Sequence, residues 1–212
     1  MKALSQTSSL NKFSQQSLAL LFTFGGFFPV TSIILHCLGI LPLQQCLVFL
    51  VIPVLLSFIT LGIKFPGIGK TVIVGFIAGI ISVFLYDLSR VPYILAGWSD
   101  FIPKIGGWIT NSDEKNALLG YTWRYIGNGG GMGVAFFILI SQLKNQKQLI
   151  LKGLLYGLFI FSGLMLTLFF FEQTQAMMFK ITPVSFTGSI TGHIIYGTVL
   201  GVLAKKYFAN KK

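Results

Sequence analysis

Two arginines and one aspartate interrupt long apolar stretches of this sequence. The chain has 16 basic residues, and only two of them, Arg90 and Arg124, are arginines. Arginine presents a planar fork of donors that stays charged, so it suits a buried carboxylate or a phosphate better than lysine does. Asp87 precedes Arg90 by three residues, a spacing at which the two can pair along one helix. The pattern favours either a structural salt bridge between helices or a ligand site, and both alternatives stay open.

Aromatic and imidazole side chains accompany these charges. Tyr86 and Arg90 are four residues apart and share a helical face, and Tyr125 adjoins Arg124. His193 lies near the middle of the last apolar run, where an imidazole can relay protons, bind a metal or bond a neighbouring helix. Polar groups within a membrane are costly and usually face the interior of the bundle. We therefore predict a ligand-binding cluster made of Asp87, Arg90, Arg124, Tyr86, Tyr125 and His193.

The sequence lacks the motifs of common membrane enzymes. It contains neither a G-x-S-x-G nucleophile motif nor an H-E-x-x-H metal motif. Ser189 and His193 share one predicted helix, whereas a serine nucleophile and its base would be expected on separate helices. Met177 and Met178 belong to no spaced ligand motif, and methionine is an ordinary packing residue. We expect no cofactor and no metal, and an enzyme is the less favoured hypothesis.

Composition predicts that these residues lie in a membrane. Of the 212 residues, 54% are hydrophobic and 10% are charged, and the mean hydropathy is +0.79. An ordinary soluble domain has about 25% charged residues, so this chain could not cover a soluble fold. The apolar runs are continuous and about 20 residues long, the length of a transmembrane helix, without the alternation of a transmembrane barrel. We predict an all-α membrane protein, a bundle of about six transmembrane helices.

The predicted helices follow one another within a single transmembrane domain, residues 17–204. Residues 1–16 form a polar N-terminus and residues 205–212 a basic tail. Residues 97–117 combine tryptophans with charged residues, which is typical of an interfacial segment, and we place one between helices 3 and 4. The expected helix bounds are 17–40, 43–63, 70–96, 117–141, 149–171 and 183–204.

The charges predict an orientation. With both termini in the cytoplasm, the outer half of the protein carries five basic and five acidic residues, and the other eleven basic residues are cytoplasmic. The net charge of +11 is then wholly cytoplasmic, as the positive-inside rule requires. We predict a multi-pass protein of the cytoplasmic (inner) membrane with the lipid bilayer as a partner. Nucleic acid is excluded, because the lysines are spread over short loops and tails.

Cysteine and glycine positions bear on packing. Cys37 and Cys46 flank a predicted outer turn, where they either form a disulfide or remain free thiols. The chain has 24 glycines, and small-xxx-small pairs allow helices to approach closely. The glycine-rich run 127–133 fits close packing or an unwound stretch that lines a path. We expect helix 4 to pack through this run against Gly188 and Gly192 of helix 6, with His193 pointing inward.

Four motifs follow one another between residues 70 and 204: Gly75-x-x-x-Gly79, Tyr86-Asp87-Leu88, Gly120-Tyr121-Thr122-Trp123-Arg124-Tyr125 with the glycine run, and Gly192-His193-Ile194-Ile195-Tyr196-Gly197-Thr198-Val199-Leu200-Gly201. In this order they resemble small bacterial six-helix membrane-protein families catalogued only as domains of unknown function. Where such proteins have His after the aromatic residue of helix 4, this chain has Arg124. The resemblance implies no established activity, and it points to Asp87, residues 123–125 and His193.

Two functional hypotheses follow. The first is a small transporter or permease-like protein that binds a small solute at a polar site in the outer half of the bundle. The alternative is a non-catalytic assembly partner of a membrane complex, or a membrane enzyme with an outward-facing pocket. A continuous polar path through the bundle would favour transport, a blind outer pocket would favour an enzyme or receptor, and a dry core would favour assembly.

Overall fold

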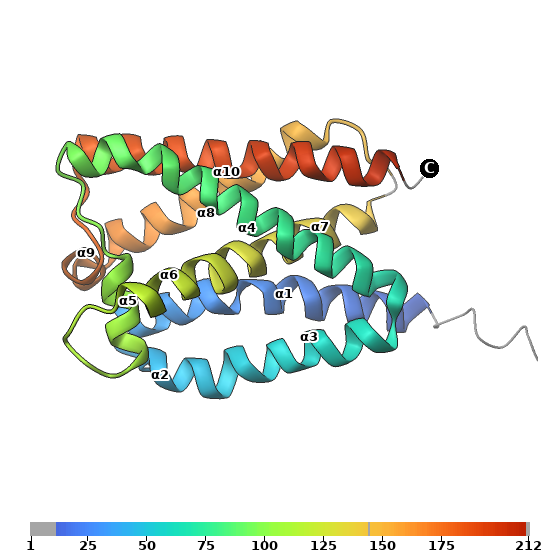
Figure 1. Ribbon diagram of the computed structural model, residues 1–212, viewed down its shortest axis with the longest axis horizontal. Helices are drawn as coiled ribbons and strands as arrows, with labels where there is room; N and C mark the ends of the chain where they lie inside the picture. The colour runs from blue at the N-terminus through green and yellow to red at the C-terminus, as the bar shows by residue number, and fades with distance from the viewer. Residues whose placement is uncertain (1–11, 144, 211–212) are drawn as a thin grey trace, which may run out of the picture.

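The structure, a computed structural model, describes residues 12–143 and 145–210, and helices are the regular secondary structure of this part of the chain. Figure 1 shows the long helices lying roughly along one axis. The predicted all-α class is confirmed, and five helices are long and apolar enough to cross a membrane. Of the predicted N-terminus 1–16, residues 1–11 lie outside the described residues, and α1 begins at Lys12.

The long apolar helices are α1 (Lys12–Cys37), the continuous run of α2 (Leu43–Cys46), η1 (Leu47–Val51) and α3 (Ile52–Lys64), α4 (Pro66–Leu95), α8 (Leu149–Phe170) and α10 (Pro183–Ala209). The shorter segments are α5 (Ile102–Ile109), α6 (Ala117–Thr122), η2 (Trp123–Gly130), α7 (Gly131–Gln142) and α9 (Glu172–Met177). Both π-helical segments, η1 and η2, continue directly into α-helix.

The helix predicted over residues 117–141 is built from three segments in series. Asn116 caps α6 by accepting a hydrogen bond from the backbone N–H of Leu119 at 3.0 Å. The chain then becomes π-helical over η2 and returns to α-helix in α7. Single π-helical insertions of this kind are frequent at functional sites. The glycine run is therefore helical rather than unwound.

Several helix boundaries differ from the predictions, those of α4 and α10 among them. α4 begins at Pro66 instead of residue 70, because proline is tolerated in the first helical turn, where its missing N–H is not needed. α10 extends to Ala209, so residues 205–209 of the predicted tail are helical. At its start, Thr182 and Ser185 form a capping box, in which each side chain bonds the other residue's backbone N–H.

The helices pack in the order α1, α7, α4, α10 and α8, each against the next. The predicted contact between helices 4 and 6 is largely wrong, because α10 packs mainly on α4 and α8. The glycines of helix 4 serve other partners: Gly131 faces Gly26 of α1, and Gly129 faces Gly79 of α4. Small-xxx-small spacing specifies how closely a helix can be approached, not which helix approaches it.

The run α2–η1–α3 lies at the edge of the bundle, with only 6% of its most apolar window buried. Figure 1 shows it beside α1, with the start of α1 and the C-terminus at one end of the molecule and α5 and α9 at the other. Cys37 and Cys46, at that second end, are buried free thiols, so the described structure contains no disulfide between them.

Candidate functional site

Asp87 of α4 and Arg124 of η2 form a close ion pair, as predicted. Arg124 Nε donates to both carboxylate oxygens of Asp87, at 2.7 and 2.8 Å, and Nη2 lies 2.5 Å from Oδ1. The side chains of Arg124 and Asp87 are only 11% and 13% exposed. The predicted proximity is confirmed, whereas ligand binding by these residues stays a prediction.

Arg90 extends this pair into a row of alternating charges. Its Nη1 donates to Asp87 Oδ1 at 3.2 Å, and its Nη2 donates to Asp100 Oδ1 at 3.1 Å. The guanidinium lies 4.8 Å from the centre of the Trp98 ring, a cation–π contact. We call Asp100, Arg90, Asp87 and Arg124 the charge row. It contains two acids and two bases, so its formal charge is zero and it can be buried without an outside counter-ion.

Asp100 is a member of the site that sequence analysis missed. Tyr121 Oη donates to its Oδ2 at 2.8 Å, and the backbone N–H of Ile102 donates to its Oδ1 at 3.2 Å. Part of the segment predicted to be interfacial packs into the end of the bundle that carries α5 and α9, where Trp98 is 3% and Ile102 0% exposed. The available signal was that Asp100 is one of only five acids in the chain.

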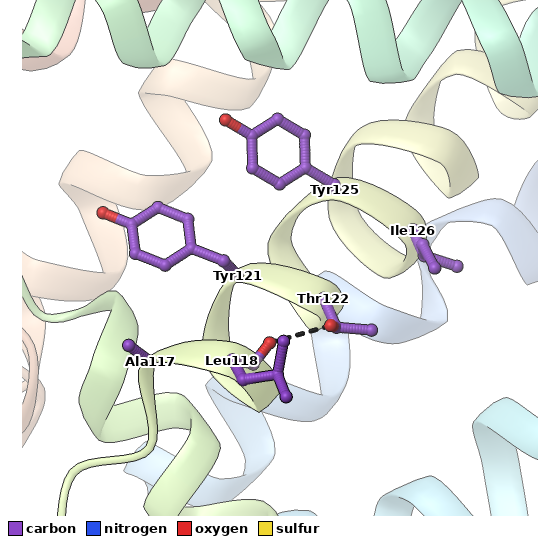
Figure 2. A pocket seen from close by; sticks show the side chains of 6 residues that line it. All are labelled: Ala117, Leu118, Tyr121, Thr122, Tyr125 and Ile126. Carbon is purple, nitrogen blue, oxygen red and sulfur yellow. Dashed lines mark hydrogen bonds between the residues drawn. The ribbon is translucent and has the colours of Figure 1, made fainter.

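Tyr121 and Tyr125 are half-buried and stand side by side along α6 and η2, on the side from which Tyr121 reaches Asp100. Figure 2 shows both rings projecting in the same direction, and their centroids are 6.3 Å apart with planes inclined by 30°. With Ala117, Leu118, Thr122 and Ile126 they line a shallow, open hollow. Tyr125 of the predicted cluster therefore belongs to this surface hollow, and not to the cavity described next.

A cavity of about 430 Å³ lies inside the bundle, next to the charge row. Four of the six predicted site residues line it: Tyr86, Arg90, Arg124 and His193. The remaining wall is mostly apolar and comes from α1, α4, α8 and the loops, including Phe27, Val30, Ile34, Val83, Phe159, Ile160, Leu164 and Phe179. Asp87 is absent from this lining and reaches the cavity only through the arginines that it holds.

His193 of α10 points inward, as predicted, and is 7% exposed. Its Nδ1 lies 2.8 Å from the carbonyl oxygen of Ser189. A carbonyl can only accept, so Nδ1 must carry the proton, and Nε2 of the neutral ring is an acceptor. The ring meets Tyr86 edge-on, with centroids 5.0 Å apart at 84°. The structure thereby fixes the ring orientation against one wall of the cavity.

Besides Nη2 of Arg124, which meets Asp87 only as an ion pair, two further lining residues hold buried polar atoms without a hydrogen-bond partner among the described residues: Nε1 of Trp98 and Oδ1 of Asn128. A buried polar group left unpaired costs about 1–3 kcal/mol, so both atoms are available to a bound molecule. Neither residue was predicted. Asn128 had a recognisable signal, since it is the only polar side chain in the glycine run 127–133.

The groups around the cavity include hydrogen-bond donors and acceptors that a bound molecule could use. Ser189 and His193 lie on one turn of α10, and the hydroxyl of Ser189 has no partner in the described part of the chain. Within the same residues, no group of three or more His, Cys, Asp or Glu side chains could hold a metal.

Comparison of the chain with protein-family models, with curated proteins and with solved structures gave no match.

Proposed function

We propose that this protein is a small permease-like membrane protein that binds a solute in the interior cavity. The observation that carries the proposal is this cavity, with both arginines and His193 in its wall. Ligand sites are typically concave, mostly apolar and about 300–1,000 Å³ in volume, with a few polar groups that orient the ligand. The cavity has all of these features.

The membrane arrangement belongs to the same proposal. α6, η2 and α7 together make a sixth crossing, the protein lies in the cytoplasmic membrane, and both termini are inside. Under this orientation the charge row and the cavity lie in the outer half of the bilayer. The positive-inside distribution of lysines supports it, as does the position of both described chain ends at one end of the bundle (Figure 1).

η2 is the element best suited to move during transport. It carries Arg124 and Asn128, which line the cavity, and it packs against both α1 and α4. Two of its glycines lie directly against side chains of the neighbouring helices: Gly127 meets Pro29 of α1 and Gly129 meets Val83 of α4. A change between π- and α-helical hydrogen bonding would shift the two polar residues relative to the cavity.

One observation favours a second candidate, a membrane receptor or enzyme with an outward-facing pocket. Toward the end that bears both termini, the cavity stops at Met132 and Tyr196. Beyond them lies a buried apolar cluster that includes Phe136, Tyr156 and Leu200. Tyr156 Oη also donates to the carbonyl of Met132 at 2.8 Å, which closes this end. A permease must open this seal, whereas a receptor need not.

Thiol labelling tests the proposal without knowledge of the solute. In a background with Cys37 and Cys46 replaced by alanine, Met132→Cys places a thiol at the inner end of the cavity. A membrane-impermeant maleimide is applied to oriented proteoliposomes from one side at a time. We expect labelling from both sides, because a permease alternates between outward-open and inward-open states.

The matched control is Val134→Cys, on the same helix but 1% exposed and outside the cavity lining. It should resist the reagent from either side. Labelling of Met132→Cys from the outer side alone would replace the permease by the receptor or enzyme candidate. If the reagent labels Met132→Cys from neither side, the cavity is not accessible from water, and the proposal that it binds a solute is wrong.

A further inference from the structure

We infer that the ligand of the interior cavity is a single-chain amphiphile with an uncharged, hydroxyl-bearing head, which enters from the bilayer between α1 and α8. The inference rests on the proposed function, because it names the chemical class of the solute of that same cavity. It is carried by three features: an opening in the cavity wall, the apolar character of that wall, and the hydrogen-bonding atoms left unused beside the charge row.

The opening lies between α1 and α8. Phe24 and Phe159 both line the cavity, yet they are 64% and 65% exposed on the outside of the bundle. Gly163 also lines the cavity, and a Cβ built on it would meet no neighbouring atom within 4 Å. The cavity wall is thus continuous with the lipid-facing surface at these residues.

The opening has defined edges. On the side nearer the termini, the rings of Phe27 and Phe159 join α1 to α8, with centroids 6.5 Å apart in an edge-to-face arrangement. At the opposite end of the bundle, α9 contacts α1. Between these edges lie Thr31 of α1 and Gly163 of α8, both exposed and both part of the cavity lining. We call this opening the side portal.

The route through the side portal favours a molecule that is already dissolved in lipid. The portal faces hydrocarbon on the outside and leads onto Val30, Ile160 and Leu164 on the inside. A water-soluble solute would have to shed its hydration before reaching the portal, whereas an alkyl or isoprenoid chain gains apolar contact throughout. The chain of an amphiphile therefore fits the wall, and its head would reach the polar end of the cavity.

Charge balance favours an uncharged head. Both arginines in the wall are already paired with Asp87 and Asp100. A carboxylate or phosphate would therefore add a buried negative charge to a neutral row, and an ammonium would add a positive one. Burial of an ion without a compensating charge is strongly unfavourable in a low-dielectric interior.

The unused polar atoms favour hydroxyl groups in particular. Trp98 Nε1 can only donate and Asn128 Oδ1 can only accept, and both are buried without a partner among the described residues. His193 lines the same cavity, and its Nε2 is an acceptor in the neutral ring whose Nδ1 bonds Ser189. A hydroxyl can donate and accept at once, so a head with two hydroxyls can satisfy all of them. A carboxylate can only accept and would confront the two acceptors. The set of partners therefore selects against an anion as well as against a bare hydrocarbon.

The test compares ligands that share one chain. The full-length protein, in mixed micelles, is titrated with 1-monoolein, oleate or oleoylcholine, and bound ligand is counted by native mass spectrometry. Because an unmatched buried hydrogen bond commonly costs a factor of ten or more, we expect monoolein to bind at least about tenfold more tightly than either charged analogue. Equal or tighter binding of oleate would overturn the assignment of an uncharged head.

Two substitutions test the placement. Gly163→Trp is designed to fill the side portal, and a Cβ at this position meets no neighbouring atom within 4 Å. It should weaken monoolein binding at least about tenfold, whereas Ser162→Trp, on the lipid-exposed neighbour, should change it less than about twofold. Equal losses of monoolein affinity in the two variants would rule out entry through the side portal.

Trp98→Phe keeps a ring over Arg90 but deletes the unpartnered N–H. It should weaken monoolein binding severalfold while the thermal stability of the unliganded protein is unchanged or raised. If no amphiphile binds while Met132→Cys is still labelled from both sides, the permease proposal is retained and the assignment of an amphiphile as its ligand is wrong. If Met132→Cys is labelled from the outer side only but monoolein binds as expected, the ligand class stands and transport is wrong.

Discussion

Asp87 accepts hydrogen bonds from both arginines of the chain. The two arginines depend on it to different degrees. Arg90 keeps Asp100 as a partner when Asp87 is lost. Arg124 has no second acid among the described residues. Removal of one member of a buried ion pair usually costs more than the pair itself contributes, because the remaining charge is left without compensation. The loss of Asp87 should therefore act mainly through Arg124.

We expect Asp87→Asn to lower the free energy of unfolding by about 3–5 kcal/mol, measured by denaturant titration in detergent. The double variant Asp87→Asn/Arg124→Gln should cost less than this single change, since it leaves the balanced pair of Arg90 and Asp100. Asp113→Asn, in an exposed loop, is the control and should have little effect. A double variant as unstable as the sum of its single changes would show that the pair is not coupled.

The sequence was sufficient to identify the arginines but not all of their neighbours. Arginine is so rare here that Arg90 and Arg124 stand out by type alone, and the spacing of Asp87 predicted its pairing. Asp100 and Trp98 could not be assigned in the same way, because their segment has the composition of a membrane interface. Only the packing of this segment and α5 onto one end of the bundle brings them against Arg90.

At the level of helices, the sequence predicted which helix faces allow close packing, but not which helices would pack against each other. The glycine pairs on α8 and α10 do what their spacing predicts: Gly153 and Gly157 meet Gly197, backbone against backbone. The glycines of helix 4 divide between α1 and α4, which no single-helix pattern could reveal. The π-helical turn of η2 was equally hidden, since hydrophobic periodicity over so few residues cannot distinguish it from an α-helix.

This difference between crowded and open glycines gives an element-scale prediction. A Cβ at Gly197 would overlap the carbonyl oxygen of Gly153, a backbone atom that cannot move without separating α8 from α10. Gly197→Ala should therefore lower the free energy of unfolding by about 1–3 kcal/mol. Gly163→Ala, at an open position of α8, should be neutral or raise it by up to about 1 kcal/mol through helix propensity. Thermal unfolding in detergent compares the two, and equal losses would contradict the packing described.

For the molecule as a whole, the sequence contains six apolar runs, and five of them form helices long enough to cross a membrane. Composition and run length predicted an all-helical membrane protein, and five long apolar helices confirm that part. Residues 117–142 are divided among α6, η2 and α7, none of which is long enough to cross alone. Hydropathy detects the length of a run, but it does not detect how the backbone hydrogen bonds within the run are arranged.

Reporter fusions test the proposed orientation. A fusion at Asn145, between α7 and α8, should report a cytoplasmic position, and one at Asp113, between α5 and α6, an external position. The expected result follows from the lysine-rich loop around residues 144–152 and the positive-inside rule. A fusion after Ala209 should agree with the one at Asn145. Reversed readings at Asn145 and Asp113 would show that the proposed orientation is wrong. Identical readings at the two sites would show that α6, η2 and α7 do not cross the membrane.

The ion pair between Asp87 and Arg124 also has a consequence for biosynthesis. The two residues are 37 positions apart, so at about 5–20 residues per second the ribosome adds Arg124 about 2–7 s after Asp87. During that interval α4 must enter the bilayer without its partner helix. Arg90, three residues from Asp87 on the same helix, can neutralise the carboxylate until η2 arrives. We therefore expect Arg90 to balance the charge of Asp87 while the chain is still being made, and Arg124 to become its closer partner once the helices have packed.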